Sequence, residues 1–316
     1  MLQEDLKKLK ENVKEALYFD INAPFEEGYN PWIIEPLVPL ESITVLDGLG
    51  GSGKSWFALN LAYSIGLEKD FLGMFPVRKN GTVLYLTAEE TPPVFFQRLK
   101  AIRKHYPENM NFAWISLLHK KLNLSPYICR RKRGEQVVTA TAEILEYLID
   151  ETKPILVVLD SLVNFYGLKE NDSEDASFFY DVLKYLMRKY GTGFLLLHHQ
   201  NKEGMRIQSD DVISFRGSSV FREQARSRII YKNLKITEKL IARKIILEKF
   251  NFYSKLIEDL KLEDGIYLKF EGGIHKYDKA FELEAKKAEE EAKNKNKKQG
   301  KSKKKQEKIE DDDIPF

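Results

Sequence analysis

The segment Gly48-Leu49-Gly50-Gly51-Ser52-Gly53-Lys54-Ser55 lies between a strand-like run, Ile43 to Leu46, and an apolar run without breakers, Trp56 to Ile65. It fits the pattern G-x-x-x-x-G-K-[ST], which in a strand, loop and helix context turns backbone N–H groups inward around phosphates. The N-terminus of the following helix adds a favourable dipole for an anion. The segment therefore predicts a nucleoside triphosphate site.

The residue types in this loop have distinct predicted roles. The glycines let the backbone approach the β-phosphate, Lys54 reaches the β- and γ-phosphate oxygens, and Ser55 holds Mg²⁺. A glycine-rich turn with only a structural role has no need of the lysine-serine pair after the last glycine. The predicted nucleotide contacts are Gly48, Gly50, Gly51, Ser52, Gly53, Lys54, Ser55 and Trp56.

Length and composition indicate one main α/β domain with attached ends. The chain has 316 residues, of which 43% are hydrophobic, enough for a full core. A net charge of +3 is too small to indicate nucleic acid by itself, so any basic surface must be local. The single cysteine, Cys129, excludes an internal disulfide. No apolar run approaches about 18 residues and the N-terminus is charged, so we expect a cytoplasmic protein without membrane contact.

Strand-like and helix-like segments alternate after the loop. The strand-like segments are 82–87, 112–117, 155–160 and 193–198, and the helix-like segments are 93–103, 137–149 and 174–189. This alternation predicts a mostly parallel, doubly wound α/β sheet with helices on both faces. The run Ile155 to Leu159 is apolar throughout, as a strand covered on both faces should be.

The C-terminal part of the sequence has a different pattern of predicted elements. Beyond residue 226, the strand-like runs 227–231, 240–247 and 265–270 follow one another with few helices between them. We expect them to form antiparallel strands that extend the edge of the sheet. The resulting core would span residues 41–277.

The two ends are predicted to lie outside this core. Residues 278–293 pair acidic and basic residues four apart, which predicts a solvated helix. Residues 294–310 are rich in lysine and almost free of apolar residues, which predicts a disordered linker. Residues 1–40 combine an amphipathic helix, with Leu2, Leu6, Leu9, Val13 and Leu17 on one stripe, and a Pro-rich entry. That stripe packs either on its own domain or on a neighbouring subunit.

Acidic residues at strand ends are the candidates for metal binding and for catalysis. Asp160 ends an apolar strand, as the second Mg²⁺ anchor of an NTPase should, although such an aspartate also commonly starts a turn. Hydrolysis needs a group that orients or deprotonates water, and Glu89, just beyond the strand 82–87, is the best candidate. Its neighbour Glu90 is the weaker candidate. The alternative for this pair is an acidic first helical turn stabilised by the helix dipole.

Histidines and arginines follow the strand 193–198. His198 and His199 stand where a polar group can contact the γ-phosphate, and without cysteine or glutamate at ligand spacing they make a poor zinc site. The long polar segment 201–217 carries the candidate DNA contacts Lys202, Arg206 and Arg216. Arg222, Arg226 and Arg228 follow, and an arginine here could stabilise transition-state charge in a neighbouring subunit; surface ion pairing is the alternative for each.

Several motifs together resemble the RepA-type branch of the RecA-like ATPases, over about Pro31 to Tyr231. The matching strings are Pro31-Trp32-Ile33-Ile34-Glu35, the Gly48 to Ser55 loop, Tyr85-Leu86-Thr87-Ala88-Glu89-Glu90, Arg98, Leu159-Asp160-Ser161-Leu162, His198-His199 and Arg216-Gly217-Ser218-Ser219. The resemblance implies ATP and Mg²⁺, a hexameric ring with ATP at subunit interfaces, and single-stranded DNA in its channel. It also implies a RecA-like P-loop NTPase fold.

The same resemblance implies roles for individual residues. Glu89 resembles the catalytic carboxylate, Arg98 an active-site arginine, and His199 or His198 the γ-phosphate sensor. Arg226 resembles the finger supplied across the interface. The basic run Arg130 to Arg133 has no counterpart role in the family, and it either contacts phosphates or is simply solvated.

The last six residues resemble the acidic tip of bacterial single-stranded DNA-binding proteins. They are Asp311, Asp312, Asp313, Ile314, Pro315 and Phe316. A terminal Phe and its carboxylate can enter an apolar pocket rimmed by basic residues, and the aspartates steer the encounter. A tail kept for solubility would not require Ile-Pro-Phe. The predicted receptor is a replication protein such as a polymerase or a primase. Alternatively, the tip folds back and competes with DNA for the basic loops of its own chain.

These observations favour an ATP-dependent DNA helicase of a plasmid or viral replication system. Two alternatives use the same motifs. One is a RecA-like ATPase that binds single-stranded DNA in recombination, annealing or strand protection, and the other is a helicase loader or regulatory ATPase.

Overall fold

A computed structural model describes residues 30–199, 219–238 and 240–292, together with residues 7, 8, 10, 11, 13 and 294. The chain divides into two compact units, Met1–Pro31 and Trp32–Phe316. Most of the predicted N-terminal helix, the linker after residue 294 and the acidic tip lie outside the described residues.

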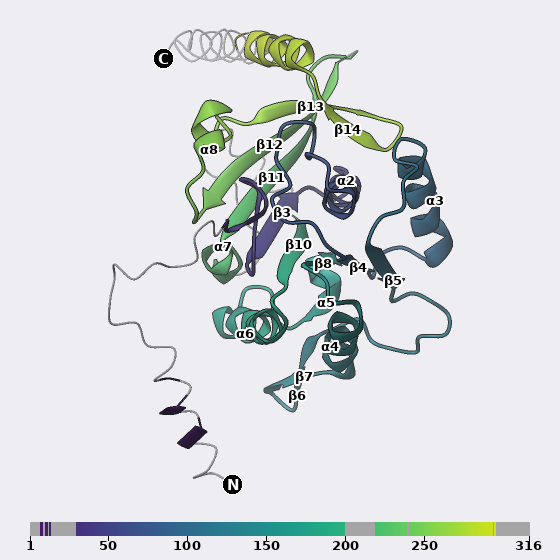
Figure 1. Cartoon of the computed structure of the whole chain (residues 1–316), viewed down its shortest axis with the longest axis vertical. Coiled ribbons are helices and arrows are strands. Elements are labelled where there is room, and N and C mark those ends of the chain that lie inside the picture. Colours follow the sequence, from purple (N-terminus) through teal and green to yellow (C-terminus); the bar gives the residue numbers. More distant parts are fainter. Residues whose placement is uncertain are drawn as a thin grey trace, which may run out of the picture. The chain divides into compact units, whose positions relative to one another are not determined.

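The second unit is built on a nine-stranded sheet (Figure 1). In spatial order its strands are β14 (Ile274–Tyr277), β13 (Ile266–Glu271), β12 (Ile241–Phe250), β11 (Ser227–Lys235), β3 (Ile43–Gly48), β10 (Gly193–His199), β8 (Leu156–Asp160), β4 (Val83–Thr87) and β5 (Phe112–Ser116). The strands from β11 to β5 run parallel, and those from β12 to β14 alternate antiparallel. Parallel strands end at a common edge, so the residues that follow β3, β4, β8 and β10 are brought together.

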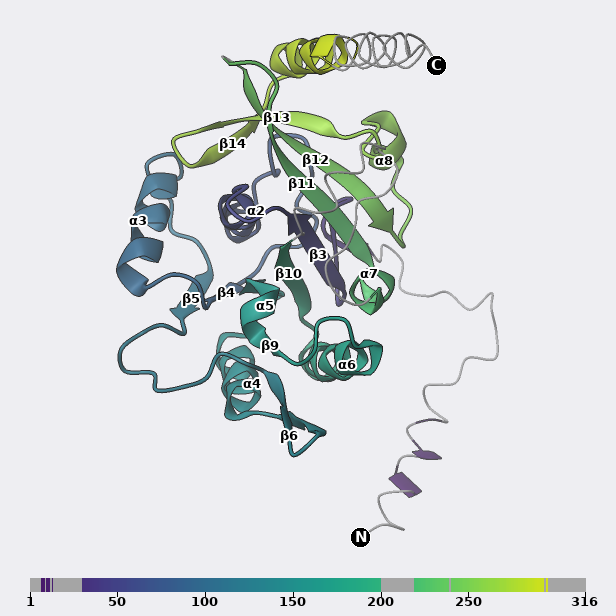
Figure 2. The same ribbon diagram turned by 180° about the vertical axis from the view of Figure 1, so that it is seen from behind.

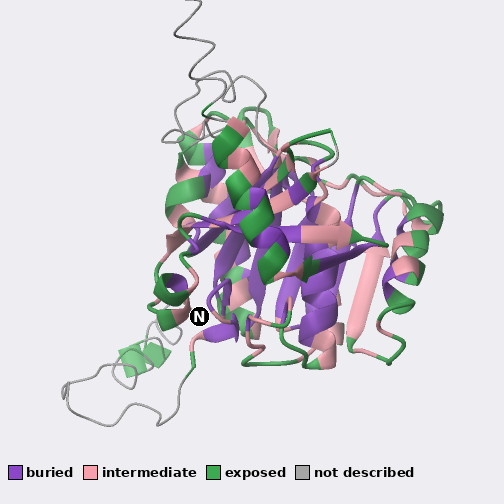
Figure 3. Cartoon of the chain, turned by 90° about the horizontal axis from the view of Figure 1, so that it is seen from above, coloured by how far each residue is buried: buried purple, intermediate pink, exposed green. Residues whose placement is uncertain are grey.

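Helices cover both faces of the sheet, as the two views in Figures 1 and 2 show. One face packs against α2 (Lys54–Leu67), α3 (Pro92–Arg103) and α8 (Lys255–Asp259). The other packs against α4 (Ala140–Thr152), α5 (Leu162–Phe165), α6 (Ser173–Tyr190) and α7 (Val220–Gln224). The central strands and much of α2 are buried, whereas the outer helices expose one side (Figure 3). No helix in the described parts of the chain is long and apolar enough to cross a bilayer.

Side chains of β10 alternate between these two cores. Leu195 and Leu197 belong to the core beneath α2, and Phe194 and Leu196 to the core beneath α6. This period of two places the consecutive residues His198 and His199 on opposite faces. Neighbours in sequence therefore enter different environments.

The predicted fold class is confirmed: the chain has the α/β fold of a P-loop NTPase, with a mostly parallel sheet and an antiparallel extension. Strand β11 belongs to both parts of the sheet, because it is parallel to β3 and, as predicted, antiparallel to β12. The Arg226 N–H donates to the Ile43 carbonyl at 2.9 Å, so β11 starts at the edge where β3 starts. Antiparallel pairing begins only after the chain reverses between Ile236 and Leu240.

The predicted start of the helix 137–149 was wrong, because α4 begins later in the chain. Residues Glu135–Val138 form β7, which pairs with β6 (Cys129–Lys132) in a hairpin, and β6 also pairs with β9 (Tyr166–Gly167). The β-branched pair Val137 and Val138 suits a strand, and left-handed φ angles of 53° at Arg133 and 91° at Gly134 make the turn. Helix α4 begins only after Thr139, whose side chain accepts from the Thr141 N–H at 3.1 Å.

The helix near the C-terminus and the Pro-rich entry segment both contain structure that the sequence did not indicate. The helix over 279–292 has the predicted Glu282–Lys286 ion pair, at 2.9 Å, but it is not wholly solvated, because Phe281 and Ala285 are buried with residues of the sheet extension. The Pro-rich entry forms a small pair of strands, β1 (Trp32–Ile34) and β2 (Val38–Pro39).

Candidate nucleotide-binding and catalytic site

The phosphate-binding loop joins β3 to α2, and two of its glycines are required by their surroundings. Gly53 has φ 108°, and a Cβ there would lie 3.2 Å from the Tyr231 hydroxyl. A Cβ on Gly48 would lie 2.5 Å from the Tyr231 carbonyl oxygen. Strand β11 therefore packs directly against the loop at Tyr231, and only glycine lets the loop backbone approach Tyr231 this closely.

Lys54 lies within this loop. Its Nζ donates to the carbonyls of Gly48 and Leu49, each at 2.9 Å, and to Nδ1 of His199 at 3.1 Å. The side chain is almost completely buried, and this burial lowers the pKa of Lys54 to about 8. A buried ammonium with only partial charge compensation is a strong partner for a phosphate.

Asp160 and Ser55 form the predicted metal position. The Asp160 carboxylate accepts hydrogen bonds from Tyr85, at 2.7 Å, and from Ser55. Burial raises the pKa of Asp160 in spite of these hydrogen bonds, so a cation would be favoured beside this carboxylate. A hydroxyl and a carboxylate are the hard oxygen ligands that Mg²⁺ prefers when phosphates supply further ligands. The residues therefore fit Mg²⁺, which when bound would neutralise charge on the nucleotide phosphates.

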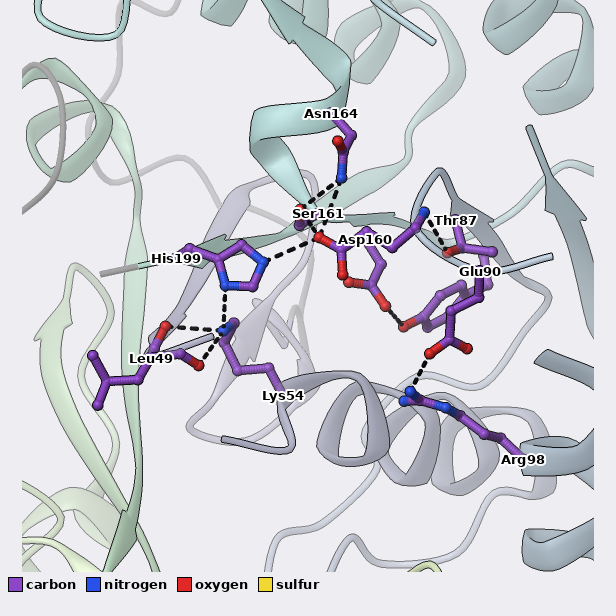
Figure 4. A network of polar contacts seen from close by, with 12 residues as sticks. Leu49, Lys54, Thr87, Glu90, Arg98, Asp160, Ser161, Asn164 and His199 are labelled. Carbon is purple, nitrogen blue, oxygen red and sulfur yellow. Dashed lines mark hydrogen bonds and ion pairs between the residues drawn. The ribbon is translucent and has the colours of Figure 1, made fainter. Parts of the chain in front are cut away.

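Three side chains labelled in Figure 4, Ser161, Asn164 and His199, donate hydrogen bonds to Glu89. Its Oε1 accepts from Ser161 Oγ, from Asn164 Nδ2 at 3.1 Å and from His199 Nε2 at 3.1 Å. The hydrogen bond from His199 is the main reason that the pKa of Glu89 falls to about 2. Glu89 is therefore ionised at neutral pH, as a water-orienting carboxylate should be.

His199 connects Glu89 to Lys54. Its Nε2 donates to Glu89, which leaves Nδ1 unprotonated to accept from the Lys54 ammonium. This pair of contacts fixes one neutral tautomer of the imidazole. Lys54, His199 and Glu89 thus form one continuous chain of hydrogen bonds across the mouth of the site.

Arg98 and Trp56 contact each other beside the loop. Arg98 forms an ion pair with Glu90, whose pKa is raised by burial, and its guanidinium lies 5.3 Å from the centre of the Trp56 ring. Trp56 also contacts Phe270 and the hairpin turn at Gly273, where a Cβ would lie 2.6 Å from the ring. Trp56 therefore links the loop to the sheet extension, and much of its ring is already in contact with protein.

His198 does not join this site. It forms a 2.6 Å contact with Asp47, which also accepts from Arg228, and Arg228 donates to Glu248. Burial acts to raise the pKa of Asp47, but His198 and Arg228 outweigh it and lower that pKa. Of the two histidine candidates, only His199 reaches the loop.

Arg226 is exposed where β11 begins. Because β11 and β3 are parallel, Arg226 lies at the edge opposite the loop, about 17 Å away for five residues of strand. It cannot reach the nucleotide site of its own subunit. The candidates Lys202, Arg206 and Arg216 and the tip 311–316 lie outside the described residues.

Sequence reasoning missed the residues that position the predicted ones. Ser161 and Asn164 bind Glu89, and Tyr85 binds Asp160. A signal was available for the first two, since they are polar and directly follow the strand-ending Asp160. Tyr85 also left a signal, because a tyrosine within a buried strand needs a partner for its hydroxyl.

The assembled site has the parts needed for phosphoryl transfer to water. Lys54 supplies positive charge for the β- and γ-phosphates, Ser55 and Asp160 suit Mg²⁺, and the ionised Glu89 can orient the attacking water. Among the described residues no three His, Cys, Asp or Glu side chains cluster as a separate metal site.

Comparison with known families agrees with this geometry. The family model of the AAA domain matches residues 17–205, more than half of the chain. The matched range includes the loop from Gly48 to Ser55, Glu89, Asp160 and His199. The chain therefore belongs to the AAA domain family of nucleotide-hydrolysing P-loop ATPases.

Proposed function

We propose that this ATPase is a DNA helicase of a plasmid or viral replication system, which hydrolyses ATP at the subunit interfaces of a hexameric ring and moves along single-stranded DNA. The observation that carries the proposal is the hydrogen-bonded chain Lys54, His199 and Glu89. It joins the nucleotide position to the last residue of β10, shortly before the polar segment that carries Lys202, Arg206 and Arg216.

This chain of contacts offers a way to couple hydrolysis to DNA. Lys54 would turn from the loop carbonyls toward the β- and γ-phosphates when ATP binds, which changes its contact with His199. After hydrolysis and phosphate release that contact would form again. Because His199 ends β10, each change would act on the segment that follows, and small shifts at a γ-phosphate are known to reorder such segments.

The positive charges near the site support a contribution from a second subunit. Arg98 is engaged by Glu90, so its charge is largely compensated. An arginine that stabilises transition-state charge can be supplied by another subunit, and it is worth about 10³-fold or more in rate. Arg226 is exposed on the opposite edge of the sheet, as a head-to-tail ring would require.

The remaining partners follow from the sequence. The tip Asp311 to Phe316 would recruit a replication protein such as a polymerase or a primase, since an acidic segment with a terminal Phe suits an apolar pocket with a basic rim. We expect the ring to act in the cytoplasm.

Strand separation tests this function. The full-length chain is mixed with a forked DNA duplex, ATP and Mg²⁺, beside Glu89→Gln, which should keep nucleotide affinity but lose about 10²- to 10⁴-fold in hydrolysis. Glu143→Gln, which removes an exposed carboxylate on α4, is the matched control. Unwinding by the unaltered chain and the control, but not by Glu89→Gln, supports the helicase. ATP-dependent binding to the single-stranded arm without unwinding would favour a single-strand-binding ATPase instead.

A further inference from the structure

The β6–β7 hairpin carries basic side chains that the nucleotide site does not use. Arg130 and Lys132 are exposed on one face of β6, and Arg133 is exposed in the turn. Among the residues that the structure describes, none of these three has an ion-pair partner. The exposed Glu135 is the register partner of Lys132, so the three cations leave a net positive charge on this short hairpin, and such a surface suits an external anion.

The opposite face of the hairpin is fixed to the domain. Arg131 pairs with Asp175 at 2.7 Å, and Gln136 donates to the same carboxylate at 2.7 Å. Asp175 is fully buried at the start of α6 and also accepts from the Lys169 N–H at 3.0 Å. Arg131 therefore anchors the hairpin, and its three exposed neighbours are presented on a rigid support.

An exposed aromatic ring lies beside these cations. The Tyr127 side chain is 40% exposed, and a Cβ on Gly167 would lie 2.6 Å from its Cγ. Gly167 is the register partner of Arg130, so the ring is adjacent to the basic face. A polyphosphate backbone with accessible bases uses both features, because phosphates bind cations and bases stack on aromatic rings. Charge attraction to an acidic peptide would not require the ring.

The hairpin is also connected to Glu89. Strand β9 pairs with β6 and directly follows α5, which carries Asn164. The Ile128 N–H donates to the Phe165 carbonyl at 2.8 Å, so the start of the hairpin is bonded to the end of α5. Asn164 in turn donates to Glu89. A ligand bound to the hairpin could therefore shift α5, the helix whose Asn164 supports the Glu89 carboxylate.

We propose that the β6–β7 hairpin binds single-stranded DNA, with Arg130, Lys132 and Arg133 on phosphates and Tyr127 stacked on a base. The inference rests on the proposed function, since that function makes single-stranded DNA the ligand. It adds a second contact region to the segment 201–217 and connects that region to the support of Glu89.

Fluorescence anisotropy of a labelled single-stranded oligonucleotide tests the proposal with the full-length chain. The triple variant Arg130→Ala/Lys132→Ala/Arg133→Ala should lose at least about tenfold in affinity near physiological salt. Its slope of log affinity against log salt should flatten by about 2, since each phosphate contact contributes about 0.7 for a single strand. Tyr127→Ala should lose about fivefold or more, and Tyr127→Phe should retain binding.

Matched variants separate the site from a general loss of charge or of folding. Lys79→Ala/Lys120→Ala/Lys255→Ala removes three exposed lysines that lie elsewhere on the described surface, without ion pairs there, and should change affinity much less. Arg130→Lys/Arg133→Lys keeps the charge and should restore most of the binding. Circular dichroism and thermal melting establish that the hairpin variants are folded.

The outcomes distinguish this inference from the proposed function. Equal affinity of the two triple variants, in a chain that does bind the oligonucleotide, overturns the hairpin site and leaves the helicase proposal standing. A chain that binds but does not unwind overturns the helicase and keeps the hairpin site. Absence of binding by the unaltered chain overturns both. If the hairpin triple variant loses affinity for a labelled Asp-Asp-Asp-Ile-Pro-Phe peptide but keeps its affinity for DNA, the ligand is an acidic peptide and the DNA assignment is overturned.

Discussion

Two consecutive histidines at the end of β10 serve two different polar clusters. His198 contacts Asp47 within a buried network that includes Arg228, whereas His199 joins Lys54 to Glu89 at an open edge of the sheet. In the buried cluster each charge has a fixed protein partner, and in the open cluster Lys54 is held only by carbonyls and a neutral imidazole. The buried cluster therefore holds the strand ends in place, and the open cluster keeps charge available for a ligand.

The buried cluster should show its role in stability. Arg228→Met removes a fully buried guanidinium and leaves the Asp47 carboxylate short of a cation, so we expect unfolding to become easier by about 3–5 kcal/mol. Urea denaturation measures the change. Arg78→Met, which breaks an exposed ion pair with Glu35, should cost at most about 1 kcal/mol. Similar losses for both variants would contradict a special role for the buried network.

Matched substitutions of the two histidines should separate the clusters further. His199→Gln breaks the contacts with Lys54 and Glu89, and we expect turnover to fall by about 100-fold because Glu89 loses its position. His198→Gln should instead lower the free energy of unfolding by about 1–3 kcal/mol, since a buried partner loses its hydrogen bond. ATPase assays and urea denaturation on the same samples provide both readings. Equal losses of turnover for the folded variants would show that the two faces of β10 are not independent.

The open cluster, unlike the buried one, was largely predictable from the sequence. The loop Gly48 to Ser55 is a local pattern, and Asp160 and Glu89 both follow apolar strands, so parallel pairing brings them together. Arg228 and Asp47 are 181 positions apart and belong to no motif, so their ion pair depends on a strand register that the sequence does not reveal. The hairpin was missed for another reason: Val137 and Val138 fit the start of a helix pattern as well as a strand, and the choice depends on the anchor at Asp175.

A pH series should expose the uncompensated charge of Lys54. Its pKa of about 8 is depressed by burial, so the ammonium in the empty site loses its proton as pH rises above 8. Phosphate binding favours the charged form, so ATP affinity should fall by up to about tenfold per pH unit above pH 8 and change little just below it. Calorimetric titration between pH 7.5 and 9.5 tests this. Lys54→Arg stays charged over this range and should show a flat profile, and a matching decline in that variant would contradict the assignment to Lys54.

The smallest expected effect concerns the support of Glu89. Asn164→Ala removes one of the three hydrogen bonds to that carboxylate, so kcat should fall by about two- to tenfold, the equivalent of one ordinary hydrogen bond. The Michaelis constant for ATP should change little, because Asn164 contacts the carboxylate and not the loop that holds the phosphates. Asn80→Ala, which breaks an exposed contact with Glu68, is the matched control.

A higher kcat in Asn164→Ala would reverse this assignment, since Asn164 would then restrain Glu89 in a resting position rather than align it. If α5 also carries the effect of DNA bound at the hairpin, stimulation of hydrolysis by single-stranded DNA should weaken in Asn164→Ala and stay unchanged in Asn80→Ala.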